Sequence, residues 1–397
     1  MVKRLLLLLL VFLLTACQGS SVAMLAPTPT TEPPTATLAP TDNTPKPTAT
    51  PEPTEILTPT ATSTPVERLV YPEGLSAVFV NSDGSNKEKL ELLSPDSVPA
   101  DTAVQNLQPS PDGRYLAFGA VTGFYQPGTY YSAMHIMDLQ TKSAIAATKN
   151  GEWNELGGGA SWSPDSRKMV FFSNAIWDND IGQLEYLTSY GDTRKHPLYP
   201  VWSPSGEYIA FACFESEFSF PMSSLGESHG ELCLIRPDDT EVQTLVEHIY
   251  LPDSRPPNAF SWSPDGRWIA YLAGDTMPDI AIVNIETRET RILASSPAKD
   301  TNPDWSPDGT RIAFASNRNG KDEVFVVGLD GRNLTSLTPN SEFDNFNPVW
   351  SPSGNHIAFT SFDPGTSVHM LTTITTDGTV STQIGFSGAR PVWTSGK

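Results

Sequence analysis

A five-residue motif, Trp-Ser-Pro-Asp-Gly in its fullest form, recurs along the sequence and constrains the fold more than any other feature. Six copies begin at positions 109, 162, 202, 262, 305 and 350, and a degenerate seventh begins at Trp393. Successive copies are separated by 53, 40, 60, 43, 45 and 43 residues. Repetition at such a period is typical of proteins built from copies of one supersecondary unit.

Each copy of the motif is followed by runs of β-branched and aromatic residues that are typical of short strands. Examples of the first run are YIAF at 208–211, WIAY at 268–271 and RIAF at 311–314. Turn residues separate the runs, and no stretch of useful length has helical periodicity. A unit of about 47 residues with four strands fits one blade of a β-propeller. The sequence therefore predicts an all-β, seven-bladed β-propeller over 67–397.

The two ends of this region complement each other. Before the first motif, 68–71, 76–84 and 89–93 are predicted to be the second to fourth strands of a blade that lacks its first. The stretch 390–396 is predicted to be a first strand with no blade after it. We expect the N- and C-terminal strands to form one blade together, because closing the ring removes free sheet edges that promote aggregation.

The repeat, with its Ile-Ala-Phe type of following strand, resembles the propeller repeat of TolB. Related repeats occur in prolyl oligopeptidase-type propellers and in oligogalacturonate lyases. The resemblance covers nearly all of 67–397 and implies the propeller fold, but propellers host unrelated activities. TolB also has an N-terminal α/β domain and usually six blades, whereas this chain begins differently.

The motif itself is predicted to be structural. Ser, Pro, Asp and Gly in this order suit the successive positions of a type I turn, and the preceding Trp is large enough to fill the gap between blades. A catalytic group is needed once, whereas the motif recurs, and Ser166, Ser205 and Ser353 replace its Asp or Gly. No Gly-x-Ser-x-Gly follows a strand, so peptidase activity is not expected.

The first 66 residues predict export and a lipid anchor. Lys3 and Arg4 precede an apolar run over 5–14, which is too short to span a bilayer and is typical of a signal peptide. Leu14-Thr15-Ala16-Cys17 resembles the bacterial lipobox, which implies a lipoprotein signal peptide over 1–17 and acylation of Cys17. An ordinary secretory signal with a chance Cys is the alternative. Residues 18–66 include a Pro/Thr-rich tract and are predicted to form a disordered stalk.

The charge and the cysteines add two further expectations. The formal net charge of −20 makes nucleic acid and anionic lipid headgroups poor partners. Besides Cys17, the chain holds only Cys213 and Cys233, which flank one predicted hairpin. They could form a disulfide in an oxidising compartment or remain two buried thiols, and the sequence leaves both open.

Candidate binding residues lie just before each motif, where the chain passes from the outer strand of one blade to the innermost strand of the next. We expect these side chains to ring one mouth of the central channel. The set comprises Asn106, Tyr199, Asn258, Asp300, Asn302, Asp344, Asn347 and Arg390. Their amide and carboxylate groups could bind a peptide or sugar, or could satisfy backbone groups in the connecting turns.

The preferred interpretation is a membrane-anchored extracytoplasmic propeller that binds or scaffolds a protein, peptide or glycan of the cell envelope. We expect a monomer without enzymatic activity, bound metal or other cofactor. The alternative is a carbohydrate-active lyase or hydrolase that uses the channel mouth. A metal-dependent lyase would gather histidines near the ring axis, whereas the six histidines here are scattered along the chain.

The lipobox resemblance predicts the outcome of replacing one residue. Cys17→Ala should abolish incorporation of labelled palmitate, because the acylated thiol and the new amino terminus both belong to Cys17. The protein should also move from the membrane to the soluble fraction. An ordinary secretory signal would instead give an unlabelled wild-type protein, and membrane fractionation with fatty-acid labelling distinguishes the two.

Overall fold

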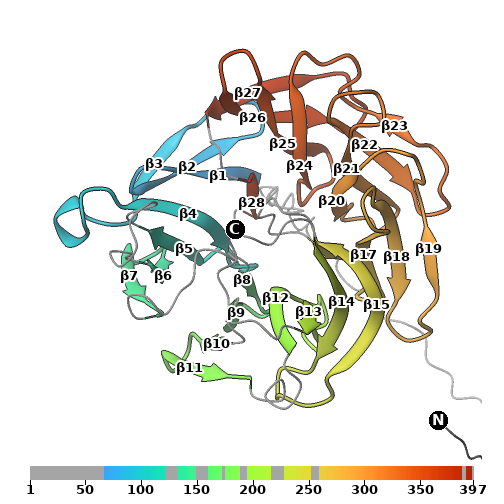
Figure 1. The fold of residues 1–397 in the computed structure, drawn as a ribbon. Coiled ribbons are helices and arrows are strands. Elements are labelled where there is room, and N and C mark those ends of the chain that lie inside the picture. The colour runs from blue at the N-terminus through green and yellow to red at the C-terminus, as the bar shows by residue number, and fades with distance from the viewer. Residues whose placement is uncertain are drawn as a thin grey trace, which may run out of the picture. The chain divides into compact units, whose positions relative to one another are not determined.

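The computed structural model describes residues 67–121, 132–148, 160–171, 175–187, 195–215, 228–251, 259–386 and 390–395. They lie in one compact unit, Ala61–Lys397. Seven four-stranded antiparallel sheets follow one another around a ring (Figure 1), which confirms the predicted seven-bladed propeller. Across the described ranges, no helix has the length and apolar character needed to cross a membrane.

We number the blades in chain order and give their strands as they occur in each sheet. Blade one contains β28 (Val392–Ser395), β1 (Glu67–Glu73), β2 (Ser76–Asn81) and β3 (Glu88–Glu91), followed by the short 3-10 helix η1 (Pro95–Ser97). Blade two contains β4 (Ala103–Pro109), β5 (Tyr115–Val121), β6 (Ser132–Asp138) and β7 (Ser143–Ala146). Blade three contains β8 (Ala160–Trp162), β9 (Lys168–Phe171), β10 (Ala175–Asp178) and β11 (Gln183–Tyr186).

The remaining blades have the same order of strands from the ring axis outward. Blade four contains β12 (Lys195–Trp202), β13 (Ile209–Glu215), β14 (Ser228–Ile235) and β15 (Gln243–Leu251). Blade five contains β16 (Phe260–Trp262), β17 (Trp268–Ala273), β18 (Asp279–Asn284) and β19 (Thr290–Ile292). Blade six contains β20 (Asp300–Trp305), β21 (Arg311–Ser316), β22 (Glu323–Gly328) and β23 (Thr335–Ser336). Blade seven contains β24 (Asp344–Trp350), β25 (His356–Asp363), β26 (Val368–Thr375) and β27 (Ser381–Phe386).

The recurring motif forms the turn between the two inner strands of a blade. In blade five, the Ser263 hydroxyl donates to the Asp265 carboxylate at 2.6 Å and accepts from the Trp268 backbone N–H at 2.9 Å. Gly266 has a φ of 70°, a left-handed conformation that glycine adopts without steric cost. The side chains of the motif therefore close and brace a turn, and their polar atoms are used in doing so.

The motif tryptophans lie between blades, and three of them donate a hydrogen bond to the blade before. Trp162 donates its indole N–H to the Gln108 carbonyl at 2.9 Å, and Trp262 donates in the same way to the Val201 carbonyl at 3.2 Å. Both indoles are buried. Apolar clusters accordingly lie between blades; in one of them Val324 of blade six packs with Trp350 of blade seven.

Blade one closes the ring from both ends of the domain, as predicted. β28 pairs with β1 in antiparallel register from Glu67↔Ser395 to Val70↔Val392. Trp393 repeats the link between blades by donating to the Val349 carbonyl at 3.1 Å. Figure 1 shows β28 beside β1, although the two strands come from opposite ends of the propeller region.

Deleting 390–397 is expected to destabilise the whole propeller. The deletion removes the innermost strand of blade one together with the buried Trp393. Loss of a buried tryptophan side chain alone typically costs about 3–5 kcal/mol. Urea unfolding should therefore show a midpoint well below that of the full chain, and an unchanged midpoint would contradict the closure.

Candidate functional site

Four of the predicted channel-mouth residues share an unusual backbone conformation. Asn106, Tyr199, Asn302 and Asn347 have φ values of 53°, 55°, 54° and 54°. Each lies where the pairing of an innermost strand with its neighbour shifts register, that is, at a β-bulge. Asparagine tolerates left-handed φ better than most residues, so the bulge accounts for its recurrence at three of these positions.

The recurring asparagine suggested binding chemistry in the sequence. In the structure, it also adopts the positive φ that the β-bulge needs. Tyr199 is buried at this position, whereas Asn106, Asn302 and Asn347 are half-buried. A bulge was detectable in the sequence, because an asparagine that recurs at a fixed place inside a predicted strand favours positive φ. Asn258 lies outside the described residues.

Asp300 forms a structural ion pair with Arg318. Its side chain is fully buried, and one terminal nitrogen of Arg318 donates to both carboxylate oxygens at 2.9 Å. Burial raises the pKa of Asp300, and hydrogen bonds from Ser316 and Arg318 oppose that rise. The Arg318 guanidinium also lies 5.3 Å from the Phe314 ring centroid and 5.0 Å from that of Phe325. Asp300 therefore holds blade six together and is covered from solvent.

Asp344 belongs to an acidic pair at the start of blade seven. It is half-buried, and its charge adds to burial in raising the pKa of Asp322, while the charge of Lys299 opposes the rise. The backbone N–H of the neighbouring Asn345 donates to the Asp322 carbonyl at 2.7 Å. The loop before β22 and the start of β24 thus bring two carboxylates close together.

We infer that a different set of residues, which the sequence reasoning missed, forms the wall of the central channel, called here the axial wall. These residues precede the motif tryptophans by one position, so strand alternation turns them away from the side that buries the indoles. All seven are half-buried: Gln108, Ser161, Val201, Ser261, Asp304, Val349 and Val392. Period-two alternation about each tryptophan could have identified them.

Three of the axial side chains accept hydrogen bonds from the next blade. Ser161 accepts from the Trp202 backbone N–H at 3.1 Å and Ser261 from that of Trp305 at 3.2 Å. Asp304 accepts from the Trp350 backbone N–H at 2.8 Å. These contacts hold the polar groups of the wall in fixed positions, which favours selective binding because the groups need little ordering.

An acid and a base interact at this wall. Burial raises the pKa of Asp304 to about 6, although the charge of Arg390 and the hydrogen bonds from Trp350 and Ser261 oppose the rise. Burial lowers the pKa of Arg390 to about 10, against the attraction of Asp304. Arg390 precedes Trp393 by three residues, as Asn302 precedes Trp305, so it occupies the position of a bulge asparagine. Both charges are incompletely solvated.

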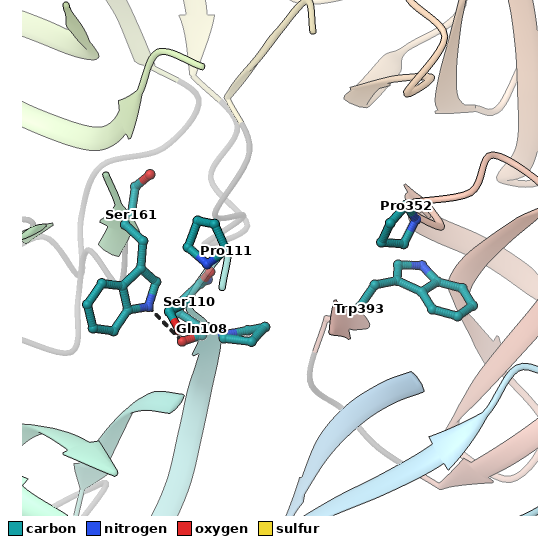
Figure 2. Close-up of a pocket in the computed structure, with 8 residues that line it drawn as sticks. Gln108, Ser110, Pro111, Ser161, Pro352 and Trp393 are labelled. Atoms are coloured by element: carbon teal, nitrogen blue, oxygen red, sulfur yellow. Dashed lines mark hydrogen bonds between the residues drawn. The ribbon is translucent and has the colours of Figure 1, made fainter. Parts of the chain in front are cut away.

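A cavity of about 430 Å³ opens on the side of the motif turns. Its walls come from four blades and are formed by Gln108, Pro109, Ser110, Pro111, Ser161, Trp162, Pro352 and Trp393. Figure 2 shows Gln108 and Pro111 on one side of this space and Pro352 and Trp393 on the other. Because four consecutive blades contribute to it, we interpret the cavity as part of one opening of the central channel.

Cys213 on β13 and Cys233 on β14 are joined by a disulfide in the structure, with Cα atoms 6.2 Å apart. The Glu231 carboxylate lies beside them and accepts from the Thr244 hydroxyl at 2.9 Å. Among the residues with described positions, these two cysteines and Glu231 are the group whose ligand atoms approach closely enough for a shared metal. Since the disulfide uses both sulfurs, we assign this cluster a structural role.

Comparisons with known proteins agree with this geometry. A family model described as the TolB beta propeller domain matches residues 238–396. The uncharacterized protein Atu1656 of Agrobacterium fabrum is 33% identical over 237 residues, which cover 55% of this chain and 70% of that protein. The chain belongs to the TolB-like β-propeller family.

This TolB-like propeller is also similar to proteins that are named as enzymes. The uncharacterized peptidase YuxL of Bacillus subtilis is 27% identical over 241 residues, covering 59% of this chain. The chain spans about a third of YuxL, 32% of its length. A solved oligogalacturonate lyase in complex with manganese has a TM-score of 0.58 and 13% identity, covering 82% of this chain and 86% of that one. At this identity the likeness shows the fold alone.

These comparisons overturn one expectation from the sequence. The prediction that the domain has no enzymatic activity is contradicted, because enzymes are prominent among the proteins that share this propeller. Besides YuxL and the lyase, a structure from a study of two prolyl endopeptidases matches with a TM-score of 0.53 and 13% identity. It covers 83% of this chain and 50% of that one. The earlier inference failed because it relied on the absence of known catalytic motifs.

The raised pKa of Asp304 should be visible in how the unfolding free energy changes with pH. Its pKa is near 6 in the folded protein and 3.8 ordinarily, so the folded state binds a proton more tightly between these values. Ionising Asp304 therefore costs stability. As pH rises from about 4 to about 6, the unfolding free energy of the wild type should fall relative to that of Asp304→Asn. Above pH 6 the difference between the two unfolding free energies should stay constant. Urea titrations at several pH values measure this, and a difference of opposite slope would contradict it.

Proposed function

We propose that this protein is an exported, lipid-anchored module that binds a protein partner of the cell envelope through its axial channel. Membership of the TolB-like family supports a protein-binding propeller. The predicted signal peptide, the acylation at Cys17 and the 18–66 stalk would hold the propeller at a distance from the membrane. The propeller is proposed to act as a monomer.

The observation that carries the proposal is the charge pair of the channel. Asp304 is the charged member of a wall otherwise formed by Gln, Ser and Val side chains, and its charge interacts with that of Arg390. Charged groups held in a partly buried site are typical of functional sites, because they can pair with a ligand group of complementary charge. A peptide segment that carries an acidic group fits this wall, because its carboxylate can pair with Arg390.

The size and lining of the cavity agree with a peptide ligand. The turn-side opening has a volume of about 430 Å³, within the range of roughly 300–1,000 Å³ typical of ligand pockets. Prolines and tryptophans surround it, and they present rigid apolar surfaces next to the polar Gln108 and Ser161. A peptide could bury apolar side chains at the opening while its polar groups reach the axial wall.

Site-specific crosslinking of the full chain in its native membrane tests this proposal. A photoreactive phenylalanine at Gln108, which lines the cavity, should capture a partner protein. The same residue at Ile292, which is 59% exposed on the outer strand β19, should not. Arg390→Gln should lower the yield at position 108 at least about tenfold, because truncating a buried charge contact commonly costs more than that.

Arg291→Gln provides the matched control for loss of an arginine. Arg291 pairs with Glu289 at 2.7 Å on the solvent-exposed rim of blade five, so its replacement should leave the crosslink yield unchanged. Equal yields from positions 108 and 292, or an Arg390→Gln variant that crosslinks like the wild type, would overturn the proposal.

A further inference from the structure

A groove lies on the sheet face of blade seven, away from the axial wall. It has a volume of about 530 Å³ and is bordered by the segment that follows β23 of blade six. β23 is only two residues long, whereas β26 and β27 of blade seven have eight and six residues. The outer strand of blade six thus ends early, and the segment after it borders the groove.

Three buried polar side chains cross the floor of this groove. Asn345, Ser361 and Thr372 are 2%, 3% and 8% exposed and come from β24, β25 and β26. The Ser361 hydroxyl donates to Asn345 Oδ1 at 2.8 Å and lies 3.1 Å from the Thr372 hydroxyl. The Asn345 amide also donates to the Phe343 carbonyl at 3.2 Å. An amide and two hydroxyls have more donors and acceptors than these bonds use.

The propeller architecture does not require these polar groups. Ser361 lies four residues after Ile357, which pairs with the motif tryptophan of its blade. The equivalent residues in blades two and five are Ala120 and Ala273. Blade six has the buried Ser316 there, but its hydroxyl interacts with Arg318 and Asp300, so that position is occupied by a structural ion pair. At the position of Thr372, blade six has the buried Phe325, whose ring would fill the space that is open here. Blade seven thus combines a polar floor with missing side-chain volume.

The lining also limits the charge of a ligand. Every residue that lines the groove is uncharged. Beside the polar floor it includes the apolar side chains of Phe343, Phe359, Met370 and Ile374, and Gln383 stands exposed on β27. An anion would find no cation in this lining and would be repelled by a chain whose formal net charge is −20.

We propose that this groove binds an uncharged sugar, as a second site independent of the axial channel. A pyranose ring presents hydroxyls around its edge and C–H groups on its faces. The edge hydroxyls match Asn345, Ser361 and Thr372, and a face matches the aromatic and aliphatic side chains beside them. The volume suffices for a disaccharide-sized ligand, since ligand pockets typically span roughly 300–1,000 Å³.

Calorimetric titration of the full chain tests this site. The probes are maltose, cellobiose, lactose and N,N′-diacetylchitobiose, each at millimolar concentration, with digalacturonate as the charged comparison. We expect saturable binding of at least one neutral disaccharide and weaker binding of digalacturonate. The double variant Ser361→Ala/Thr372→Val should weaken that binding about tenfold or more, because it removes two hydrogen-bonding groups while keeping the side chains small.

Two further variants separate loss of the site from loss of the fold. Gln383→Trp places a bulky ring at the exposed rim of the groove without touching the buried floor, and it should also abolish binding. Thr373→Val is the matched control: it lies next to Thr372 on β26, but its hydroxyl donates to the Ser82 carbonyl of blade one. It should bind like the wild type. Absence of binding to all four neutral disaccharides, or binding that persists in Gln383→Trp, would overturn the proposal.

Discussion

The structure depends on the packing of each blade against its two neighbours. A four-stranded sheet has two faces, and here both are largely apolar, so an isolated blade would leave one or both exposed. The motif tryptophan lies between blades, and the indole N–H groups of Trp162, Trp262 and Trp393 donate to the previous blade. In a ring, every blade has two neighbours, so both of its faces are covered. The pairing of β28 with β1 makes the ring continuous.

The same packing positions the polar groups of the axial wall. Because side chains alternate along a strand, the residue before each buried tryptophan points to the opposite side of the innermost strand, toward the next blade. Asp304 and the serines of the wall are placed in this way, and the next blade holds them through backbone N–H groups. The groove of blade seven, in contrast, lies beside the segment that follows the two-residue β23, where the packing between blades six and seven is incomplete.

Much of the fold was predictable because the information is local and repeated. The turn preferences of Ser, Pro, Asp and Gly, and the β-branched runs after them, act within a few residues and recur in phase. The candidate site was less predictable. Asn106, Asn302 and Asn347 stood out by composition, but their positive φ reflects bulges in the innermost strands. Asp300 suggested binding, yet Arg318, eighteen residues later in the chain, occupies its carboxylate.

By itself, the sequence determined the all-β class, the number of blades and the closure of the ring, because each follows from spacing and local preference. Its first 66 residues also carry the signals on which export and lipid anchoring are proposed. Only the tertiary structure decided which charges meet. Asp304 and Arg390 are far apart in sequence and on different blades, and the axis brings them into electrostatic contact. The floor of the groove likewise joins three strands, and the segment that follows a strand of another blade borders it. Contacts of this kind depend on how whole blades are placed, which no local pattern specifies.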